Sequence, residues 1–219
     1  MLEVPFWTSR IEHPETRIKH QEMSANYSII LLAAGSSSRL GQPKQLVQHE
    51  GVPLLLKATL TALDAKYGRV TVVLGADADV HKKLIAHLPV EIITNQEWEK
   101  GMGSSMKAGL RHVLKSRPET DAVLVMVCDQ PLLASAHLVS LIALYEKTSS
   151  PMVASRYEKT NGVPALFHRS IFNKLLEIKD QQGAKVIIES HANTIELIDW
   201  EEGRFDIDTP EDLEKLNYR

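Results

Sequence analysis

Short apolar runs alternate with segments of helical spacing along most of this chain, and this alternation constrains the fold more than any other feature. The runs are residues 27–33 (YSIILLA), 69–74 (RVTVVL), 90–94 and 122–127 (AVLVMV), with shorter candidates at 151–155, 164–168 and 194–198. Continuous apolar runs of this length are typical of strands that are buried on both faces of a parallel sheet. We therefore expect these segments to be strands of one sheet.

The segments between the runs have the spacing of helices that bury one side. Helices are predicted at residues 54–66, 77–87, 104–115, 135–147, 170–178, 184–191 and 210–216. Strands that alternate with helices imply right-handed crossovers and helices on both faces of the sheet. The expected fold is a single-domain, three-layer α/β/α structure with a mostly parallel, Rossmann-like sheet, in which ligands bind beyond the carboxyl ends of the strands.

The length of 219 residues suits one sizeable core, and we assign residues 25–219 to a single domain. Residues 1–24 are charged, contain two prolines and show no clean period. Such composition predicts a poorly ordered N-terminal extension.

Composition excludes several classes of protein. The formal net charge of -3 gives no electrostatic case for nucleic acid as a partner. No apolar run reaches the roughly 18 residues of a membrane span, and the N-terminus lacks the apolar stretch of a signal peptide. The one cysteine, Cys128, excludes an internal disulfide. We expect a cytoplasmic protein without a membrane partner.

The first strand runs into a loop of small residues, LAAGSSSRLGQPK, at residues 32–44. Its glycines, Gly35 and Gly41, permit backbone angles that other residues avoid, and exposed N–H groups in such a loop form an anion-binding concavity. Arg39 and Lys44 add two cations, which suits a triphosphate. The spacing matches neither a P-loop nor a dinucleotide fingerprint. The alternative is an ordinary turn with surface charges.

This loop resembles the signature L-A-(A/G)-G-x-(G/S)-x-R-(M/L)-G-x-x-K of the molybdopterin-dinucleotide group of nucleotidyltransferases, including molybdenum cofactor cytidylyltransferases and accessory proteins of xanthine dehydrogenase and purine catabolism. The resemblance extends over residues 27–217 and implies the fold of the nucleotide-diphospho-sugar transferases. It implies that Ala33, Ala34 and Gly35 bind the nucleotide and that Arg39 and Lys44 are catalytic. Cytidylyl members have alanine where Ala34 stands and guanylyl members have glycine, although sugar-nucleotide and isoprenoid-pathway enzymes also have alanine.

Two carboxylate motifs are candidates for a metal site. Asp129 follows the apolar run 122–127, and a carboxylate at the exit of a central strand points into the crevice where Mg²⁺ would meet phosphate oxygens. The alternative is an aspartate that opens a turn. Asp206 and Asp208 alternate in FDIDTPEDL and would share a face if extended. The resemblance implies that Asp129 and Asp208 bind Mg²⁺, with Asp206 secondary and Mn²⁺ as a possible substitute.

Two further segments resemble ligand-binding segments of the same family. The stretch NQEWEKGMGSSMKAGL implies a nucleobase wall that contains Asn95, Gly101, Ser104 and Ser105. The alternative for the serines is helix capping alone, because serine before a helix is common.

On the acceptor side, the resemblance implies roles for Gly162, Pro164, Gly183 and Lys185. Gly183 and Lys185 stand at a predicted helix start, where an anionic acceptor could bind. The family's usual aspartate is replaced by Gln181 here, which weakens a role for that position. For Lys185, an exposed helix cation is the alternative.

The resemblance implies transfer of CMP from Mg-CTP to the terminal phosphate of molybdopterin, with release of pyrophosphate. The product would be the cytosine dinucleotide cofactor of molybdenum hydroxylases such as xanthine dehydrogenase, which would be transient partners. One alternative is the same chemistry on a sugar phosphate or an isoprenoid precursor. The other is a non-catalytic accessory protein that binds the finished cofactor.

Overall fold

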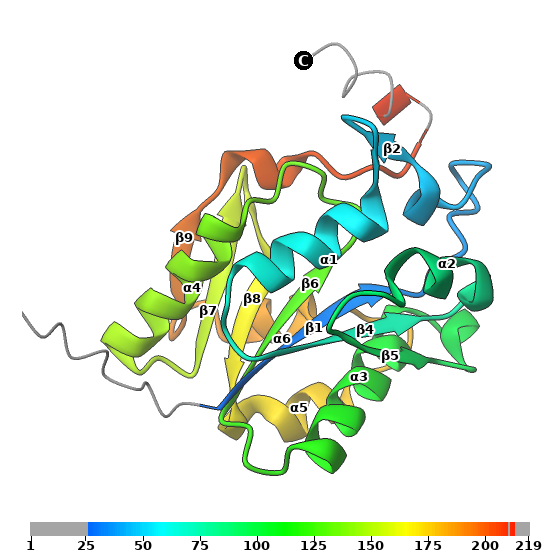
Figure 1. The fold of residues 1–219 in the computed structure, drawn as a ribbon. Coiled ribbons are helices and arrows are strands. Elements are labelled where there is room, and N and C mark those ends of the chain that lie inside the picture. The colour runs from blue at the N-terminus through cyan, green and yellow to red at the C-terminus, as the bar shows by residue number, and fades with distance from the viewer. Residues whose placement is uncertain (1–25, 210, 213–219) are drawn as a thin grey trace, which may run out of the picture.

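A seven-stranded sheet in the order β5-β4-β1-β6-β8-β7-β9 forms the centre of the molecule (Figure 1). The computed structural model describes residues 26–209 and 211–212, so the predicted extension at 1–24 and most of the predicted helix at 210–216 lie outside the described residues. The strands span Tyr27–Ala33 (β1), Arg69–Leu74 (β4), Glu91–Thr94 (β5), Ala122–Val127 (β6), Met152–Tyr157 (β7), Thr160–His168 (β8) and Glu196–Asp199 (β9).

Helices cover both faces of this sheet, which confirms the predicted three-layer α/β/α architecture (Figure 1). One face is covered by α1 (Leu54–Asp64), α2 (Ala78–Ile85) and α4 (Ser135–Thr148). The other face is covered by α3 (Met102–Ser116), α5 (Phe172–Glu177) and α6 (Lys185–Ser190).

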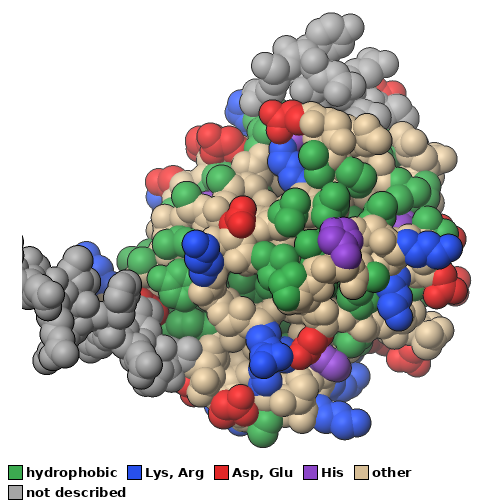
Figure 2. Space-filling view, viewed as in Figure 1, with side chains coloured by type: hydrophobic (Ala, Val, Ile, Leu, Met, Phe, Trp, Pro, Cys, Tyr) green, Lys and Arg blue, Asp and Glu red, His purple; other side chains and the backbone are tan. Residues whose placement is uncertain are grey.

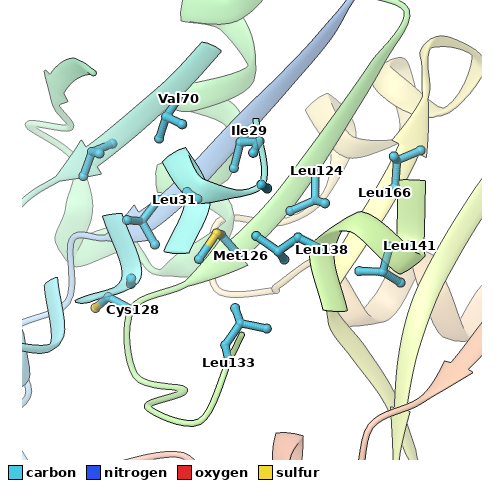
Figure 3. Close-up of a cluster of buried hydrophobic side chains, with 14 of the residues drawn as sticks. Ile29, Leu31, Val70, Leu124, Met126, Cys128, Leu133, Leu138, Leu141 and Leu166 are labelled. Carbon is cyan, nitrogen blue, oxygen red and sulfur yellow. The ribbon is translucent and has the colours of Figure 1, made fainter. Parts of the chain in front are cut away.

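The central strand β1 is buried along its whole length, as its uninterrupted apolar sequence predicts. Ile29 and Leu31 pack on the side of α1 and α4, and Figure 3 shows them beside side chains from β6 and α4. Ile30 and Leu32 pack in the opposite layer with residues of α3. Burial of such a side chain contributes about 1.5–3 kcal/mol, so two apolar layers hold β1 in place and fix where its loop begins.

The strand β8 is antiparallel to its neighbours β6 and β7, whereas the other paired strands of the sheet are parallel. The sequence predicted shorter strands at 151–155 and 164–168, but β7 and β8 extend toward each other and are joined by Glu158 and Lys159 alone. A parallel pair needs a crossover of a dozen or more residues, so this short connection forces β8 to reverse. The start of β8 therefore lies at the edge where β6 ends.

Other predicted boundaries move by a few residues. Helix α3 begins at Met102 rather than at residue 104, and the predicted helix at 170–178 is divided into a 3-10 turn at Arg169–Ile171 and α5. A small antiparallel pair, β2 (Gln48–His49) and β3 (Val52–Pro53), and 3-10 turns at Lys44–Leu46, Trp98–Lys100 and Glu201–Arg204 were not predicted. Within the described residues, no helix is long and apolar enough to cross a membrane.

Candidate active site

The loop after β1 folds back so that its last residue, Lys44, lies at the carboxyl end of the sheet. The backbone N–H of Lys44 donates to Ser37 Oγ at 2.9 Å, and the N–H of Leu40 donates to Ser37 O at 3.0 Å. Gly41 has a φ of 75°, in the left-handed region that favours glycine. The glycine and the serine contacts thus close the loop and bring Lys44 back toward β1.

Lys44 lies between two of the predicted metal-binding carboxylates. Its Nζ is 2.8 Å from Asp129 Oδ2 and 2.7 Å from Asp208 Oδ1. Arg39 Nη2 is 2.6 Å from Asp208 Oδ2. The Lys44 side chain is 14% exposed and that of Arg39 is 72% exposed, so Lys44 is the inner cation and Arg39 the outer one. The structure thus brings four predicted site residues together from three distant segments.

A small group of apolar side chains, which we call the edge cluster, holds these segments in register. Its buried members are Leu40, Val47, Leu54 and Ile207. Ile207 stands between the two C-terminal aspartates and is 1% exposed, and its N–H donates to Asp129 O at 3.0 Å. Because Ile207 points into the edge cluster, Asp208 is held close to Lys44.

The charged groups of the site form ion pairs and also include carboxylates that repel one another. Burial opposes the charged form of Lys44, but Asp129 and Asp208 outweigh it and raise its pKa. Burial likewise opposes ionisation of Asp208, yet Lys44 and Arg39 lower its pKa. The pKa of Asp206 is raised by desolvation and by repulsion from Asp129 and Asp208, although this residue keeps solvent-exposed surface. The site thus holds three carboxylates that repel one another, of which Asp129 and Asp208 form ion pairs with the two cations.

A cavity of about 290 Å³ opens beside this cluster. It is lined by Leu32, Ala33, Ala34, Gly35, Ser36, Lys44, Gln45, Trp98, Glu99, Gly101, Met102, Ser105, Val127, Cys128 and Asp129. Of the predicted nucleotide-binding residues, Ala33, Ala34, Gly35, Gly101 and Ser105 are in the lining. The cavity extends from the small-residue loop to Lys44 and Asp129.

Gly35 is open to this cavity rather than required by the fold. No described atom lies within 4 Å of the point where a Cβ at this position would stand, and its φ is not in the left-handed region. The protein itself would therefore accept a methyl group there. The absence of a side chain leaves room for a bound molecule to approach the backbone.

Asn95 and Ser104 are outside the described lining and instead build the wall behind it. Asn95 Nδ2 donates to Ser104 Oγ at 2.9 Å and to Ser105 Oγ at 3.0 Å, and its Oδ1 accepts from the N–H of Glu97 at 3.0 Å. Ser104 Oγ donates to the backbone carbonyls of Glu97 and Gly101. These contacts fix the position of Ser105, which does face the cavity.

The alternative that Ser104 and Ser105 serve only to cap a helix is wrong. Helix α3 begins at Met102, so both serines lie inside its first turn. The N–H groups of Gly103 and Ser104 both donate to Asp180 O, at 2.8 and 3.3 Å. A backbone carbonyl from a distant segment therefore satisfies these donors.

Two of the predicted acceptor-side residues lie near the carboxylates. Gln130, which follows Asp129, donates from Nε2 to Val163 O at 3.1 Å and so joins the segment of Gly162 and Pro164 to the metal motif. A Cβ on Gly162 would stand 2.3 Å from the hydroxyl oxygen of Tyr157. A larger residue at this position would therefore displace the phenol of Tyr157.

The other two acceptor-side residues differ from each other. Gly183 packs against the cavity wall, since a Cβ there would stand 2.9 Å from Met102 Sδ. Lys185 begins α6 but is an exposed side chain, 3.7 Å from Glu189 Oε1. The structure therefore places Gly183 at the rim of the cavity and does not bring Lys185 into the cluster.

Several residues of the site carried no sequence signal. Gln45, Trp98, Met102 and Cys128 line the cavity. Tyr157 adjoins the carboxylates: burial raises its pKa, and the charges of Asp206 and Asp129 raise it further. Its ring packs edge-on against Trp200, with centroids 6.1 Å apart. These residues come from strand ends, 3-10 turns and the start of α3, and no local sequence pattern shows that these segments meet in space.

The carboxylates fit a divalent cation that shares its coordination with phosphates. Among the described residues, no group of three or more His, Cys, Asp or Glu side chains is placed to hold a metal ion by itself. Mg²⁺ typically takes one or two carboxylates and fills its other positions with substrate phosphates and water. The ammonium group of Lys44 lies between Asp129 and Asp208, which shows that these oxygens can face one cation together.

The carboxyl edge of the sheet thus carries the loop of residues 34–44, which we call the anion loop after its predicted role, together with a lysine–carboxylate cluster and an adjoining cavity. Residues 29–195 match the family described as "MobA-like NTP transferase domain". The chain belongs to this family, and it is a nucleotidyltransferase of the MobA-like type.

Curated relatives of the chain include proteins with three different names. Nicotine blue oxidoreductase of Paenarthrobacter nicotinovorans is 30% identical, over 85% of this chain and 94% of the relative. Purine catabolism protein PucB of Bacillus subtilis (strain 168) is 28% identical over the same shares. Molybdenum cofactor guanylyltransferase of Vibrio cholerae is 27% identical, over 85% of this chain and 89% of the relative. The relatives thus match over nearly their whole length.

Solved structures share the fold. The crystal structure of Rv0371c from Mycobacterium tuberculosis H37Rv has a TM-score of 0.78 and 25% identity, and the match covers 90% of this chain and all of that one. A manganese complex of Rv0371C has a TM-score of 0.74 and 22% identity over 88% of this chain and 98% of that one. These matches agree with the predicted nucleotide-diphospho-sugar transferase type of fold.

Proposed function

We propose that this nucleotidyltransferase transfers CMP from CTP to the terminal phosphate of molybdopterin and releases pyrophosphate. The observation that carries the proposal is the position of Lys44 between Asp129 and Asp208, beside a cavity of about 290 Å³ lined by the small-residue loop. This arrangement presents cations to a triphosphate and carboxylates to a metal ion from one edge of the sheet. We further propose that the product supplies molybdenum hydroxylases, and that the protein acts in the cytoplasm.

In the proposed reaction, an oxygen of the acceptor phosphate attacks the α-phosphorus and forms the new P–O bond. The bond from the α-phosphorus to the bridging oxygen breaks, and pyrophosphate leaves with the electron pair. Because the attacking phosphate is already anionic, no side chain has to remove a proton. Lys44 and Arg39 hold the triphosphate, so catalysis consists of positioning and charge neutralisation.

Asp129 and Asp208, with Asp206 beside them, would hold Mg²⁺. When bound there, the ion supplies charge neutralisation at the phosphate oxygens. Manganese is bound in the Rv0371C complex, which makes Mn²⁺ a useful second ion to test. Ion binding to this protein can be measured by Mn²⁺ electron paramagnetic resonance. An Asp129→Asn variant that binds the ion as well as the wild type would contradict the assignment.

The choice of CTP rests on Ala34. This alanine lines the cavity, and the guanylyltransferase signature has glycine in its place. An added methyl group narrows the cavity and favours the smaller base. The variant Ala34→Gly should therefore raise the ratio of kcat/KM for GTP to that for CTP, by about tenfold if one methyl contact decides the fit. An unchanged ratio would show that another part of the wall reads the base.

The acceptor should bind on the side of Gly162, Pro164 and Gly183, where Gln130 joins the start of β8 to the metal motif. Lys185 could reach an anionic acceptor from the start of α6, but its side chain is exposed. Lys185→Ala should raise KM for the acceptor alone, with the exposed Lys115→Ala as a matched control at the opposite edge. Equal kinetics of the two variants would remove Lys185 from the site.

The decisive experiment is a panel of the four nucleoside triphosphates, with Mg²⁺ or Mn²⁺ and isolated molybdenum cofactor, scored by pyrophosphate release. We expect release with CTP that depends on the cofactor. Release with a sugar phosphate or an isoprenoid precursor instead would keep the chemistry and change the acceptor. Cofactor binding without release from any nucleotide would favour a non-catalytic accessory protein.

The relative named nicotine blue oxidoreductase calls for a separate assay, because it is 30% identical to this chain. In this protein, Lys44 pairs with Asp129 and Asp208 beside the cavity, an arrangement that supports the proposed phosphate transfer. We therefore expect no conversion of nicotine blue. Conversion in the absence of any nucleoside triphosphate would contradict the proposed function.

A further inference from the structure

Three consecutive carbonyl groups of the anion loop accept hydrogen bonds from the protein itself. The amide Nε2 of Gln45 donates to Ala33 O at 3.0 Å and to Gly35 O at 2.8 Å. The N–H of Ala76 donates to Ala34 O at 3.0 Å. Gln45 thus donates two of the three hydrogen bonds that these carbonyls accept.

Engaging these carbonyls determines what the loop offers to a ligand. In a planar trans peptide, the N–H group points opposite to the carbonyl group. With the Ala33 and Gly35 carbonyls directed at Gln45, the N–H groups of Ala34 and Ser36 point away from it. A phosphate is repelled by carbonyl oxygens and bound by N–H groups, so this orientation makes the loop a surface of donors.

Gln45 is itself held firmly. Its side chain is fully buried, and it belongs to the 3-10 turn Lys44–Leu46, whose following residue Val47 packs in the edge cluster. The N–H of Val47 donates to Lys44 O at 3.1 Å. The loop carbonyls and the phosphate-binding lysine are therefore fixed by adjacent residues of one short turn.

Within the described residues, the amide of Gln45 forms hydrogen bonds through its nitrogen alone. Its Oε1 is buried and has no hydrogen-bond partner among the described residues. Its orientation is nevertheless fixed, because an oxygen placed where Nε2 stands would face two carbonyl oxygens. An apolar side chain of similar length would avoid the unpaired oxygen but could not donate. The donating end of the amide is therefore the feature that this position uses.

We propose that Gln45 is a positioning residue that sets the anion loop for triphosphate binding by turning the carbonyls of Ala33 and Gly35 toward itself. The inference rests on the proposed function, since it assumes that this loop binds the phosphates. Gln45 acts through the backbone of the loop, because its side chain is fully buried where it adjoins the cavity. Its loss should therefore weaken binding of the phosphate chain and leave binding of the nucleoside unchanged.

The test uses two probes that divide the nucleotide: inorganic tripolyphosphate with Mg²⁺, and cytidine. Each is titrated calorimetrically into the wild type, Gln45→Met and Gln45→Glu. The methionine removes both donated bonds at similar volume, and the glutamate keeps the shape but places oxygen at the donor position. We expect both variants to bind tripolyphosphate at least about tenfold more weakly, the scale of two lost neutral hydrogen bonds, with cytidine affinity within about twofold.

The matched control is Ser150→Ala. Ser150 is also buried, and its Oγ donates to Met152 O at 2.8 Å, at the amino end of the sheet. This variant loses a buried hydrogen bond away from the loop and should keep wild-type affinity for both probes.

The outcomes separate the two proposals. A folded Gln45→Met protein with unchanged tripolyphosphate affinity overturns the role of Gln45 alone. If that variant does not fold, unchanged affinity in Gln45→Glu has the same meaning. Equal weakening of tripolyphosphate and cytidine binding also overturns it, because it indicates general damage to the cavity. A wild type that binds no tripolyphosphate overturns both the inference and the proposed function.

Discussion

The amino and carboxyl edges of the sheet both carry a cluster of paired charges. At the amino edge, Arg117 Nη1 is 2.5 Å from Glu91 Oε1, Nη2 donates to Thr71 Oγ1 at 3.1 Å, and Nε donates to Ser28 Oγ at 3.1 Å. The second oxygen of Glu91 lies 2.9 Å from His112 Nε2. Each nitrogen of this guanidinium group is engaged by a neighbour within the described part of the chain.

The carboxyl edge has equally short ion pairs but a different balance. Asp129 and Asp208 pair with Lys44, Asp208 also pairs with Arg39, and Asp206 adds a third carboxylate that takes no part in these pairs and that the other two repel. The cluster opens onto the cavity. By contrast, the charged and polar side chains at the amino edge form a closed network that joins β1, β4, β5 and the end of α3. The comparison shows that ion-pair distances do not distinguish a structural cluster from a functional one. The two clusters differ instead in the number of carboxylates relative to cations and in the cavity that adjoins the carboxyl edge.

The two edges also differ from the outer helical face. Figure 2 shows the side of the molecule seen in Figure 1, where basic, acidic and hydrophobic side chains are mixed. Charge on that face is dispersed, whereas at both sheet edges it is gathered around one basic residue. The following predictions test whether the edges have separate roles.

The largest effect is expected at the carboxyl edge. Lys44→Ala and Asp129→Ala should each lower kcat by on the order of 10²–10³, or about 2.7–4 kcal/mol, because each removes a central electrostatic group. Pyrophosphate release at saturating nucleotide measures this, with unfolding in urea to confirm folding. Full turnover in either variant would remove the distinction between the edges.

The next effect belongs to the amino edge. Arg117→Met should lower the free energy of unfolding by about 2–3 kcal/mol, because it leaves the partly buried Glu91 without its main partner. Turnover per folded molecule should stay at the wild-type value. Urea unfolding and pyrophosphate release measure the two quantities on the same preparation, and a variant that is stable but inactive would reverse the assignment.

A smaller effect is expected in the anion loop. Gly35→Ala should raise KM for the nucleotide about tenfold, or ~1.4 kcal/mol, and leave Tm unchanged, because the methyl group meets no described atom. Gly103→Ala is the contrasting variant. Its Cβ would stand 2.5 Å from Lys179 O and 2.6 Å from Gln182 O, so it should lower Tm. A fall of Tm in Gly35→Ala would mean that the fold itself needs this glycine.

The smallest effect is a pH dependence of stability at the amino edge. Although burial opposes it, the hydrogen bond from Arg117, with a further one from His112, lowers the pKa of Glu91. Glu91 therefore contributes stability above the usual glutamate pKa of about 4.3 and loses it as the pH falls through the lower folded-state value. In acid unfolding, Glu91→Gln should be less stable than the wild type at neutral pH, and the difference should shrink as the pH falls. A constant difference would exclude this linkage.

Much of the site could be predicted because its parts stand at strand ends. A buried run followed by small residues places Lys44 and Arg39 at the carboxyl edge, and a second buried run places Asp129 there. In FDID, alternate side chains of an extended segment lie on opposite faces, so Ile207 points away from Asp206 and Asp208. These are local patterns with one structural meaning each, and strand order then brings them together.

The remainder depends on contacts without a local pattern. The capping of α3 by Asp180 O joins segments far apart in sequence through the backbone alone, so serine side chains gave the wrong interpretation. The reversal of β8 follows from the short connection between β7 and β8. The predicted strands 151–155 and 164–168 were too short, so the predicted connection was too long to require this reversal. The sequence did not identify Gln45, because its proposed role depends on hydrogen bonds to two backbone carbonyls, and these leave no pattern in the sequence.

The edge cluster also has a consequence for how the protein is made. Ile207 is among the last described residues, and it carries Asp208 to Lys44. During synthesis, the sheet strands emerge before this segment, and domains acquire structure as the chain leaves the ribosome. A nascent chain can therefore complete its sheet while the second carboxylate is still absent. The pairing of Asp208 with Lys44 can thus form only after the strands that support it have been made.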